Sequence, residues 1–205
     1  SSTGADASAD DAGVVLDNTS IGAGAGGVSI HGTGADVTSG VILSFSNIAA
    51  GSGGALIDGQ AIAADGVYAN GSDISTSGGD ISVTGIGGAR GVYLDGALYS
   101  AGGDIVVHGE GGTGNGLDLS GPVDSAGGDI AMYGASTDAT GLEFGGGYYD
   151  GIVSAGGDIS LTGHGATGGV ALYQSNGSGP IVLFAPADVD TINSAGGDIT
   201  ITGTA

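Results

Sequence analysis

The amino-acid sequence predicts an all-β fold, a right-handed parallel β-helix of about seven three-strand rungs of about 25 residues each. Three observations predict this fold class: the phrase SAGGDI recurs, apolar and polar residues alternate after each copy, and 49 of the 205 residues are glycine without a Gly-X-Y period. Only 3 prolines are present, which excludes collagen, and a hydrophobic content of 40% opposes disorder. Because the repeat covers nearly the whole chain, residues 1–205 are expected to form a single domain.

The first strand of each rung follows the aspartate of the recurring phrase. SAGGDI begins at Ser100, Ser125, Ser154 and Ser194, and a variant, TSGGDI, begins at Thr76. Inward apolar residues then alternate with outward residues up to a glycine, the pattern of a strand buried on one face. The expected inward pairs, two degenerate copies first, are Val28 and Ile30, Ala55 and Ile57, Ile81 and Val83, Ile105 and Val107, Ile130 and Met132, Ile159 and Leu161, and Ile199 and Ile201. The strand is expected to close at Gly32, Gly59, Gly85, Gly109, Gly134, Gly163 and Gly203.

A second and a third strand complete each rung. The second reads glycine, apolar, outward, apolar, and starts at Gly13, Gly40, Gly66, Gly91, Gly116, Gly141 and Gly169. The third is a short apolar point before the next SAGGD-like turn, at Ile21, Ile48, Ile74, Leu98, Val123, Ile152 and Ile192. Three strands per repeat predict three faces, with glycine at corners where positive φ or close backbone approach disfavours a Cβ.

Stacked rungs bury the apolar side that a single rung leaves open, which is typical of solenoids. Seven rungs at a strand spacing of about 4.8 Å predict a rod of roughly 34 Å. The right-handed sense follows from the general preference of parallel crossovers and not from particular residues. A β-propeller is the alternative fold, but its blades need about 40 to 45 residues and four strands each.

Two insertions interrupt the regular rungs, at about 145–151 and 173–191. The first carries Tyr148 and Tyr149 on a glycine-rich loop. The second carries an apolar run between two prolines, which is typical of an extra edge strand or a hook. An exposed apolar segment often marks an interface, and the alternative is a flap that covers its own rod. The candidate interface residues in this run are Ile181, Val182, Leu183 and Phe184.

Charge restricts the partners. The chain has 22 acidic residues, one arginine, Arg90, and no lysine, for a formal net charge of −21. It cannot supply the basic contacts that bind phosphate backbones, so nucleic acid is excluded as a partner. The mutual repulsion is expected to be relieved by salt or by a bound cation, with calcium as the candidate ion. Cysteine is absent, and no apolar run approaches the roughly 18 residues of a membrane span, so the chain is not expected to cross a membrane.

A column of aspartates is the most regular polar feature of the repeat. Stacked rungs would place neighbouring carboxylates about 5 Å apart, where they repel, take up protons or share a cation. One role for each aspartate is to accept backbone N–H bonds at the GGD turn, and the alternative is a ladder of calcium ligands. The candidate metal ligands are Asp80, Asp104, Asp129, Asp158 and Asp198.

The other polar residues favour ordinary surface roles. Outward Ser/Thr pairs are similar to the arrays of ice-binding solenoids, but residues such as Val106 and His108 interrupt them, so the β-propensity of a solvent face explains them better. His31 and His108 lie three rungs apart and His164 is expected on a turn, which predicts no metal pair. Polysaccharide-cleaving β-helices need paired carboxylates or a carboxylate cluster with a basic residue. Only Arg90 is available, with no evident aspartate cluster beside it, so no catalytic residue is predicted and the chain is not expected to be an enzyme.

The phrase SAGGDITITG, residues 194–203, and its sibling copies resemble the repeats of filamentous-haemagglutinin-like proteins and other large bacterial surface adhesins. The resemblance covers the chain from Gly13 to Gly203. It implies a β-helical shaft exported to the cell exterior, with host or neighbouring-cell surface glycans or proteins as partners. It carries over no catalytic residue and no cofactor. Two insertions and the lack of lysine depart from a regular shaft.

The sequence favours a secreted structural protein whose copies stack end to end into a surface filament. The last strand pattern and the first complete pattern are parts of one rung, and β-helix ends are open edges that invite pairing. One alternative is a shaft segment of a much larger adhesin. A second is a polysaccharide-active or carbohydrate-binding β-helix, with the tyrosines of the first insertion and the second insertion as the ligand face. The candidate residues of the end-to-end interface are Gly13, Val14, Leu16, Ile199 and Ile201.

Overall fold

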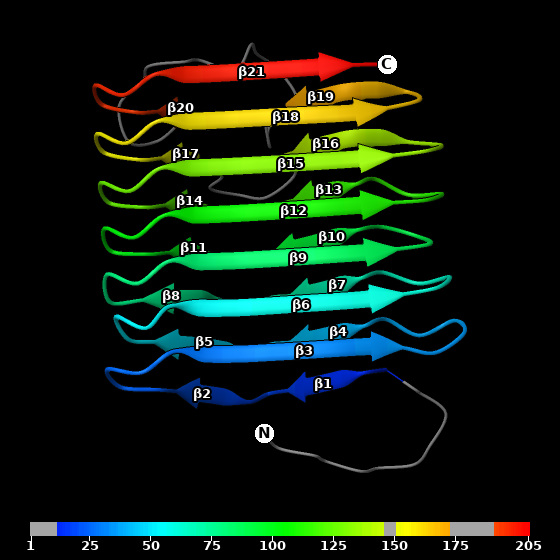
Figure 1. Ribbon diagram of the computed structural model, residues 1–205, viewed down its shortest axis with the longest axis horizontal. Coiled ribbons are helices and arrows are strands. Elements are labelled where there is room, and N and C mark those ends of the chain that lie inside the picture. Colours follow the sequence, from blue (N-terminus) through cyan, green and yellow to red (C-terminus); the bar gives the residue numbers. More distant parts are fainter. Residues whose placement is uncertain (1–11, 146–150, 173–190) are drawn as a thin grey trace.

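The computed structural model describes residues 12–145, 151–172 and 191–205, which coil into a parallel β-solenoid (Figure 1). The first rung lies at one end of the coil and the last strand, β21 (Ile199–Thr204), lies at the other. The fold and its three-strand repeat are confirmed, and the right-handed sense stays a prediction. Within the described ranges, no helix is long and apolar enough to cross a membrane.

Each rung contributes one strand to each of three seven-stranded parallel sheets. Sheet A contains β1 (Val14–Asp17), β4 (Val41–Ser44), β7 (Val67–Asn70), β10 (Val92–Asp95), β13 (Leu117–Leu119), β16 (Thr140–Phe144) and β19 (Gly168–Leu172). Sheet B contains β2 (Ser20–Gly22), β5 (Asn47–Ala50), β8 (Ile74–Thr76), β11 (Leu98–Tyr99), β14 (Val123–Asp124), β17 (Gly151–Val153) and β20 (Thr191–Asn193). Sheet C contains β3 (Val28–Gly34), β6 (Ala55–Ala61), β9 (Ile81–Gly87), β12 (Ile105–Gly111), β15 (Ile130–Ser136), β18 (Ile159–Gly165) and β21.

Equivalent residues of the repeat are paired with one another across the sheets. In sheet C, Ile105 of β12 pairs with Ile81 of β9 on one side and with Ile130 of β15 on the other. Ile130 is 1% exposed, whereas its neighbour Ala131 faces outward and is only half-buried. This confirms the predicted alternation, because every second residue of a strand points to the same face.

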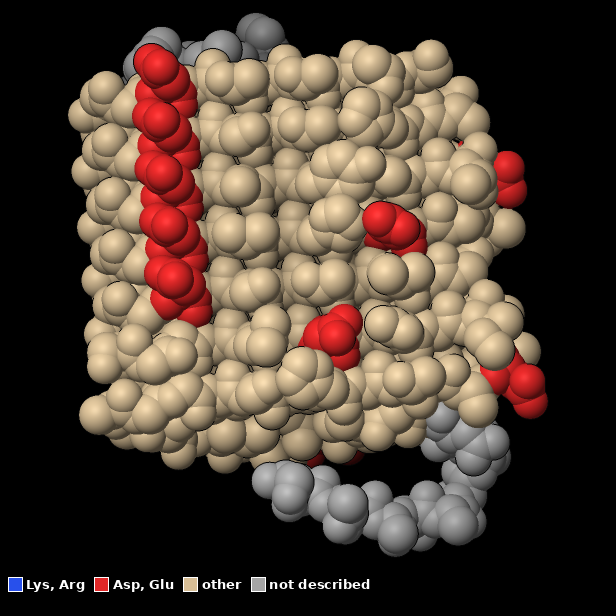
Figure 2. Space-filling model, in the orientation of Figure 1, with Lys and Arg blue, Asp and Glu red and all other residues tan. Residues whose placement is uncertain are grey.

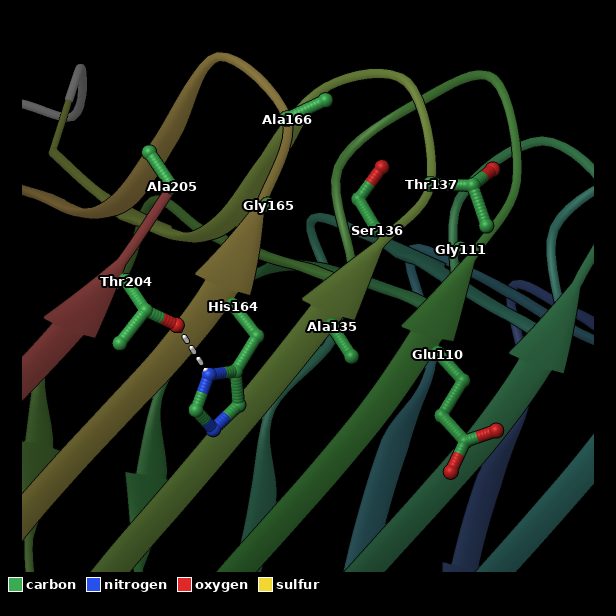
Figure 3. A pocket seen from close by; sticks show the side chains of 10 residues that line it. All are labelled: Glu110, Gly111, Ala135, Ser136, Thr137, His164, Gly165, Ala166, Thr204 and Ala205. Atoms are coloured by element: carbon green, nitrogen blue, oxygen red, sulfur yellow. Dashed lines mark hydrogen bonds between the residues drawn. The ribbon is translucent and has the colours of Figure 1, made fainter.

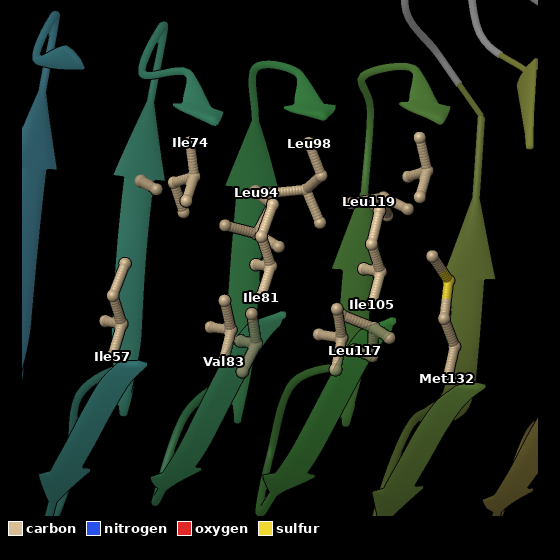
Figure 4. Close-up of a cluster of buried hydrophobic side chains, with 14 of the residues drawn as sticks. Ile57, Ile74, Ile81, Val83, Leu94, Leu98, Ile105, Leu117, Leu119 and Met132 are labelled. Atoms are coloured by element: carbon tan, nitrogen blue, oxygen red, sulfur yellow. The ribbon is translucent and has the colours of Figure 1, made fainter. Parts of the chain in front are cut away.

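The core is a stack of aliphatic layers enclosed by the three sheets (Figure 4). Sheets A, B and C all contribute, as Leu94, Leu98 and Ile105 show, and each of these side chains is at most 1% exposed. Burial of one such side chain contributes about 1.5–3 kcal/mol to the free energy of unfolding. The core therefore supplies much of the stability of a chain that has one arginine and no lysine for its salt bridges.

The corner between sheets C and A is built from paired glycines. A Cβ on Gly85 of β9 would lie 2.2 Å from the Gly91 carbonyl oxygen, and a Cβ on Gly91 would lie 2.2 Å from the Glu110 backbone nitrogen. Strand β9 runs two residues beyond Gly85, to Gly87. The expectation that Gly85 closes this strand is therefore wrong. Close backbone approach, and not a positive φ, requires glycine here. The equivalent pairs are 32/40, 59/66, 109/116, 134/141 and 163/169.

The corner between sheets B and C is built from polar contacts of the SAGGD phrase. Ser125 is fully buried, and its hydroxyl lies within hydrogen-bond distance of the carbonyl oxygens of Gly128 in its own turn and Ser154 in the next rung. The following residue, Ala126, has a φ of 52°, which L residues rarely adopt. The phrase thus fixes a tight turn whose buried hydroxyl also joins two rungs. Equivalent hydroxyls belong to Thr76, Ser100, Ser154 and Ser194.

Candidate binding surfaces

The structure brings the five predicted aspartates into one column at the start of the sheet C strands (Figure 2). Asp80 Oδ1 accepts the backbone N–H of Asp104 at 2.9 Å, and Asp104 Oδ1 accepts that of Asp129 at 2.8 Å. The same contact at 2.8 Å joins Asp129 to Asp158 and Asp158 to Asp198. Each aspartate before the last therefore accepts a backbone N–H, as one of the two predicted roles requires, but from the next rung and not from its own turn.

The second predicted role of this aspartate column, calcium binding, stays a prediction. Among the described residues, no group of three or more His, Cys, Asp or Glu side chains is arranged to hold a metal ion. Each carboxylate keeps its second oxygen, Oδ2, for other partners, and the five side chains are exposed. Calcium binds through six to eight oxygens, so water would have to complete the coordination of an ion shared by neighbouring carboxylates.

The expectation that Arg90 has no aspartate cluster beside it is wrong. Arg90 precedes β10, and its Nη2 lies 2.8 Å from Asp65 Oδ2 while its Nε lies 3.3 Å from Asp65 Oδ1. Its Nη1 lies 3.5 Å from Asp118 Oδ2 in the next rung. The guanidinium also lies 4.1 Å from the ring centroid of Tyr93 and 5.6 Å from that of Tyr68, within the range of cation–π contacts. One arginine therefore connects three successive rungs.

The residues around Arg90 belong to one column on the outer face of sheet A. Tyr68 of β7, Tyr93 of β10, Asp118 of β13 and Glu143 of β16 are paired in register. The two tyrosine rings stack at 5.1 Å between centroids, and Glu143 Oε2 accepts a hydrogen bond from Asn115 Nδ2 at 3.0 Å. All four side chains are half-buried. We call these four residues, with Arg90 and Asp65, the Arg90 cluster.

Burial and neighbouring charge shift the pKa values in the Arg90 cluster. The pKa of Asp118 is raised, first by burial and then by the adjacent Glu143 carboxylate, against the smaller lowering effect of Arg90. The pKa of Tyr93 is also raised, by burial and by the charges of Asp95 and Asp118. Burial opposes the charged form of Arg90, but Asp65 and Asp118 together outweigh it and raise the Arg90 pKa. The Tyr93 phenol therefore stays a neutral donor and acceptor, and the charged form of Asp118 is disfavoured.

A row of histidine and tyrosine side chains crosses the outer face of sheet C. The rings of His108 and Tyr133 stack at 4.6 Å between centroids, and Tyr133 lies 5.6 Å from His164. His164 belongs to strand β18, so its predicted place on a turn is wrong. Beside it, a shallow hollow of about 390 Å³ is lined by Glu110, His164 and other residues (Figure 3). His31 lies apart from this row, 3.5 Å from Asp58 Oδ2.

The predicted end-to-end interface residues lie on the outermost rungs. Val14 of β1 and Ile199 of β21 are half-buried, Leu16 is 7% exposed and Ile201 is 40% exposed. Inward residues at equivalent places of interior rungs are at most 4% exposed from β6 to β18. Gly13, just before β1, is exposed. The remaining candidates, Tyr148, Tyr149, Ile181, Val182, Leu183 and Phe184, lie outside the described residues.

The second-strand phrases of the sequence contain a signal for the Arg90 cluster. The second-strand phrases read GVYA, GVYL, GLDL and GLEF in four successive rungs. Aligning these phrases places the two tyrosines, the aspartate and the glutamate at one outward position, as the sheet register does. The ion pair between Asp65 and Arg90 also has a signal in the sequence. Both residues stand immediately before equivalent glycines, Gly66 and Gly91, and therefore occupy the same position in neighbouring rungs.

The comparisons with protein-family models, with curated proteins and with solved structures find no match. The functions of these surfaces are therefore inferred from their own residues.

Proposed function

We propose that this chain is an extracellular structural β-solenoid whose copies stack end to end into a surface filament. The observation that carries the proposal is the likeness of its two end faces. Partly buried inward residues mark both ends, and they pack against the same core: Val14, Ile21 and Val28 at one end, Val170, Leu172 and Ile199 at the other. A second copy placed on either end would cover this apolar surface as an interior rung does.

The backbone of the edge strands supports the same contact. Ile130 N–H donates to Asp158 O, and Ile159 N–H donates to Asp198 O, both at 2.8 Å. Alternate residues of a parallel strand face opposite neighbours, so Ile199 and Ile201 of β21 direct their N–H groups away from β18. In a stacked copy, Gly27 takes the place of Asp198, because Val28 begins β3 as Ile199 begins β21. Ile199 N–H would then donate to Gly27 O.

The aspartate column also favours stacking at this junction. Asp158 Oδ1 accepts the N–H of Asp198, and Asp198 Oδ1 would accept the N–H of Gly27 in the next copy by the same geometry. The equivalent positions of the first two rungs are Gly27 and Gly54, which carry no charge. The junction would therefore add a charge-assisted hydrogen bond without placing two carboxylates side by side.

A proline at Ile201 tests the stacking contact. Ile201→Pro removes a donor on the open side of β21 and leaves the ladder with β18 intact, and proline is tolerated on edge strands. We expect fibres from the parent chain by negative-stain electron microscopy and isolated particles from Ile201→Pro with an unchanged circular dichroism spectrum. Thr202→Ala changes an outward side chain of the same strand and should keep the fibres. Isolated particles from the parent chain at all salt and calcium concentrations, or undiminished fibres from Ile201→Pro, would refute the proposal.

The alternative is a shaft segment of a larger surface adhesin. It is supported by the unbroken pairing register of the described rungs and by the resemblance of the SAGGDI copies to adhesin repeats. A longer polypeptide would cover the same edges with its own rungs. The mass of the native polypeptide in the cell-surface fraction separates the two: about 19.0 kDa favours the filament subunit and a far larger chain favours the shaft.

A further inference from the structure

The outer face of sheet A carries a second surface, which the end-to-end contact does not use. Its central column changes along the rod from aromatic, with Tyr68 and Tyr93, to acidic, with Asp118 and Glu143. Arg90 lies over the boundary between them, in contact with Tyr93 and Asp118. We propose that the Arg90 cluster binds a neutral oligosaccharide that lies along the rod axis across these rungs. This proposal goes beyond filament formation and does not depend on it.

The cluster offers the mixture of donors and acceptors that sugar hydroxyls require. Arg90 donates only, the carboxylates of Asp118 and Glu143 accept, and the tyrosine phenols do both. Asp118 Oδ2 contacts Arg90 and Glu143 Oε2 contacts Asn115, while Asp118 Oδ1 and Glu143 Oε1 have no hydrogen-bond donor among the described residues. A hydroxyl can donate to one of these oxygens and accept from a phenol or guanidinium beside it. Hydrogen bonds to charged groups are stronger than those between neutral groups.

The charge balance selects the class of sugar. The cluster contains three carboxylates, Asp65, Asp118 and Glu143, and one guanidinium, so it has more negative than positive charge. A uronic acid or a sulfated sugar would be repelled, both here and by the net charge of −21. A basic peptide would meet the carboxylates but would also be repelled by Arg90, and its lysine and arginine side chains have no acceptor for the Arg90 donors. A neutral sugar satisfies donors and acceptors together.

The cluster is held in place before any ligand arrives. Asp65 is only 9% exposed, and its two oxygens hold Nε and Nη2 of Arg90, so the guanidinium has few alternative positions. Tyr68 and Tyr93 fix each other by stacking, and all four column residues stand on strands of the solenoid. Side chains that are already ordered lose little entropy on binding, which raises the affinity of a small polar surface.

Sheet C provides matched controls for this proposal. Glu110 and Glu143 are the two glutamates of the chain, and Glu110 lies on the outer face of sheet C. Tyr133 of β15 likewise matches Tyr93, since it is half-buried on that face and stacks on a neighbouring ring. Sheet C has no arginine beside Glu110 and Tyr133. The same substitutions at these two residues therefore leave the Arg90 cluster unchanged.

Isothermal titration calorimetry of the full chain with cellohexaose, laminarihexaose and chitohexaose tests the proposal, with oligogalacturonate and oligolysine as the charged probes. We expect at least one neutral hexasaccharide to bind, and Glu143→Gln and Tyr93→Leu to weaken that binding at least tenfold. Glu110→Gln and Tyr133→Leu should leave it unchanged. Thermal melting of each variant separates loss of binding from loss of folding, and Glu143→Gln keeps the shape of the side chain.

Three outcomes would overturn the assignment. The first is that none of the three neutral probes binds, and the second is that the sheet C variants weaken binding as much as the sheet A variants. The third is binding of oligolysine or oligogalacturonate alone, which would identify a basic protein or an acidic glycan as the partner instead. Fibre formation by the same samples is scored separately, so a failure of the filament proposal is distinguishable from a failure of this one.

Discussion

The chain turns from one sheet to the next at two corners that differ in what they require of the side chains. Between sheets C and A, glycines such as Gly85 and Gly91 remove the side chains so that two backbone segments touch. Between sheets B and C, Ser125 and Asp129 fill the corner with hydrogen bonds to the backbone of the next rung. The corner between sheets C and A requires residues without a Cβ, whereas the corner between sheets B and C depends on individual side-chain hydrogen bonds. A glycine-rich composition therefore serves two physical roles that a count of glycines does not separate.

The largest expected effect is at the glycine corner. Gly91→Ala would place a Cβ 2.2 Å from Glu110 N and 2.5 Å from Gly116 O, and both are backbone atoms that neighbouring strands hold in place. We expect the free energy of unfolding to fall by more than about 3 kcal/mol, or the chain not to fold. Urea unfolding followed by circular dichroism measures the change.

The control for Gly91→Ala is Gly102→Ala at the other corner. A Cβ on Gly102 meets no atom within 4 Å, and only its φ of 111° opposes the substitution. The cost of such backbone strain is about 1–3 kcal/mol. Equal losses from the two variants would show that the corners do not differ in the way the contacts indicate.

Removal of a hydroxyl tests the polar corner. Ser125→Ala leaves the carbonyl oxygens of Gly128 and Ser154 without this donor in a buried turn, which should cost about 1–3 kcal/mol. Ser125→Thr should retain most of the stability, because Thr76 occupies the equivalent place in an earlier rung. Ser160→Ala, on the outer face, should change the stability by no more than about 0.5 kcal/mol. A wild-type urea midpoint for Ser125→Ala would refute this role.

Cations should stabilise the polar corner more than the glycine corner, because the aspartate column lies there. We expect the melting midpoint to rise with ionic strength, and to rise further with calcium than with sodium at matched ionic strength. Asp129→Asn in the column should reduce the calcium-specific part, and Asp138→Asn, an exposed aspartate outside the column, should not. A midpoint independent of salt would exclude the electrostatic effect, and equal effects of the two cations would exclude a calcium site.

The smallest expected effect is a gain in stability. Ala126 has a φ of 52°, and an L residue in this region is less stable by about 1–2 kcal/mol. Ala126→Gly relieves this strain but adds chain entropy to the unfolded state, about 0.5–1 kcal/mol, so a net gain of about 0.5 kcal/mol is expected. Ala131→Gly, within a strand, should instead lose stability. If Ala126→Gly also destabilises, the turn is not strained at this residue.

The sequence alone was sufficient for the fold and for the aspartate column, because both follow from one repeated phrase. Each copy of SAGGDI places its aspartate, such as Asp104, at the same position of the rung. Parallel in-register stacking of the rungs then brings these aspartates into one column. The length of the sheet C strands was not predictable in the same way. Glycine usually interrupts a strand. Gly85 is required because it contacts Gly91, just before the following strand β10, and this contact forms only after the chain has turned.

The Arg90 cluster was missed for a related reason. Its contacts join Asp65, Arg90 and Asp118, which lie 25 and 28 residues apart along the chain and on successive rungs in space. A search for residues near Arg90 in the sequence finds neither partner. A search along the column of equivalent positions finds Asp65 directly and leads to Asp118 through Tyr93, its neighbour in sheet A.

The aspartate column gives this protein one property of a linear polyelectrolyte. Its carboxylates occur once per rung and so repeat at the strand spacing of about 4.8 Å, which is shorter than the roughly 7 Å at which two unit charges in water interact with an energy of RT. A line of charge this dense retains a layer of counterions, as DNA does, and releases them when a cationic partner binds. The logarithm of the binding constant of such a partner should therefore fall linearly with the logarithm of the salt concentration, and the partner should bind along the edge of the rod that carries the column.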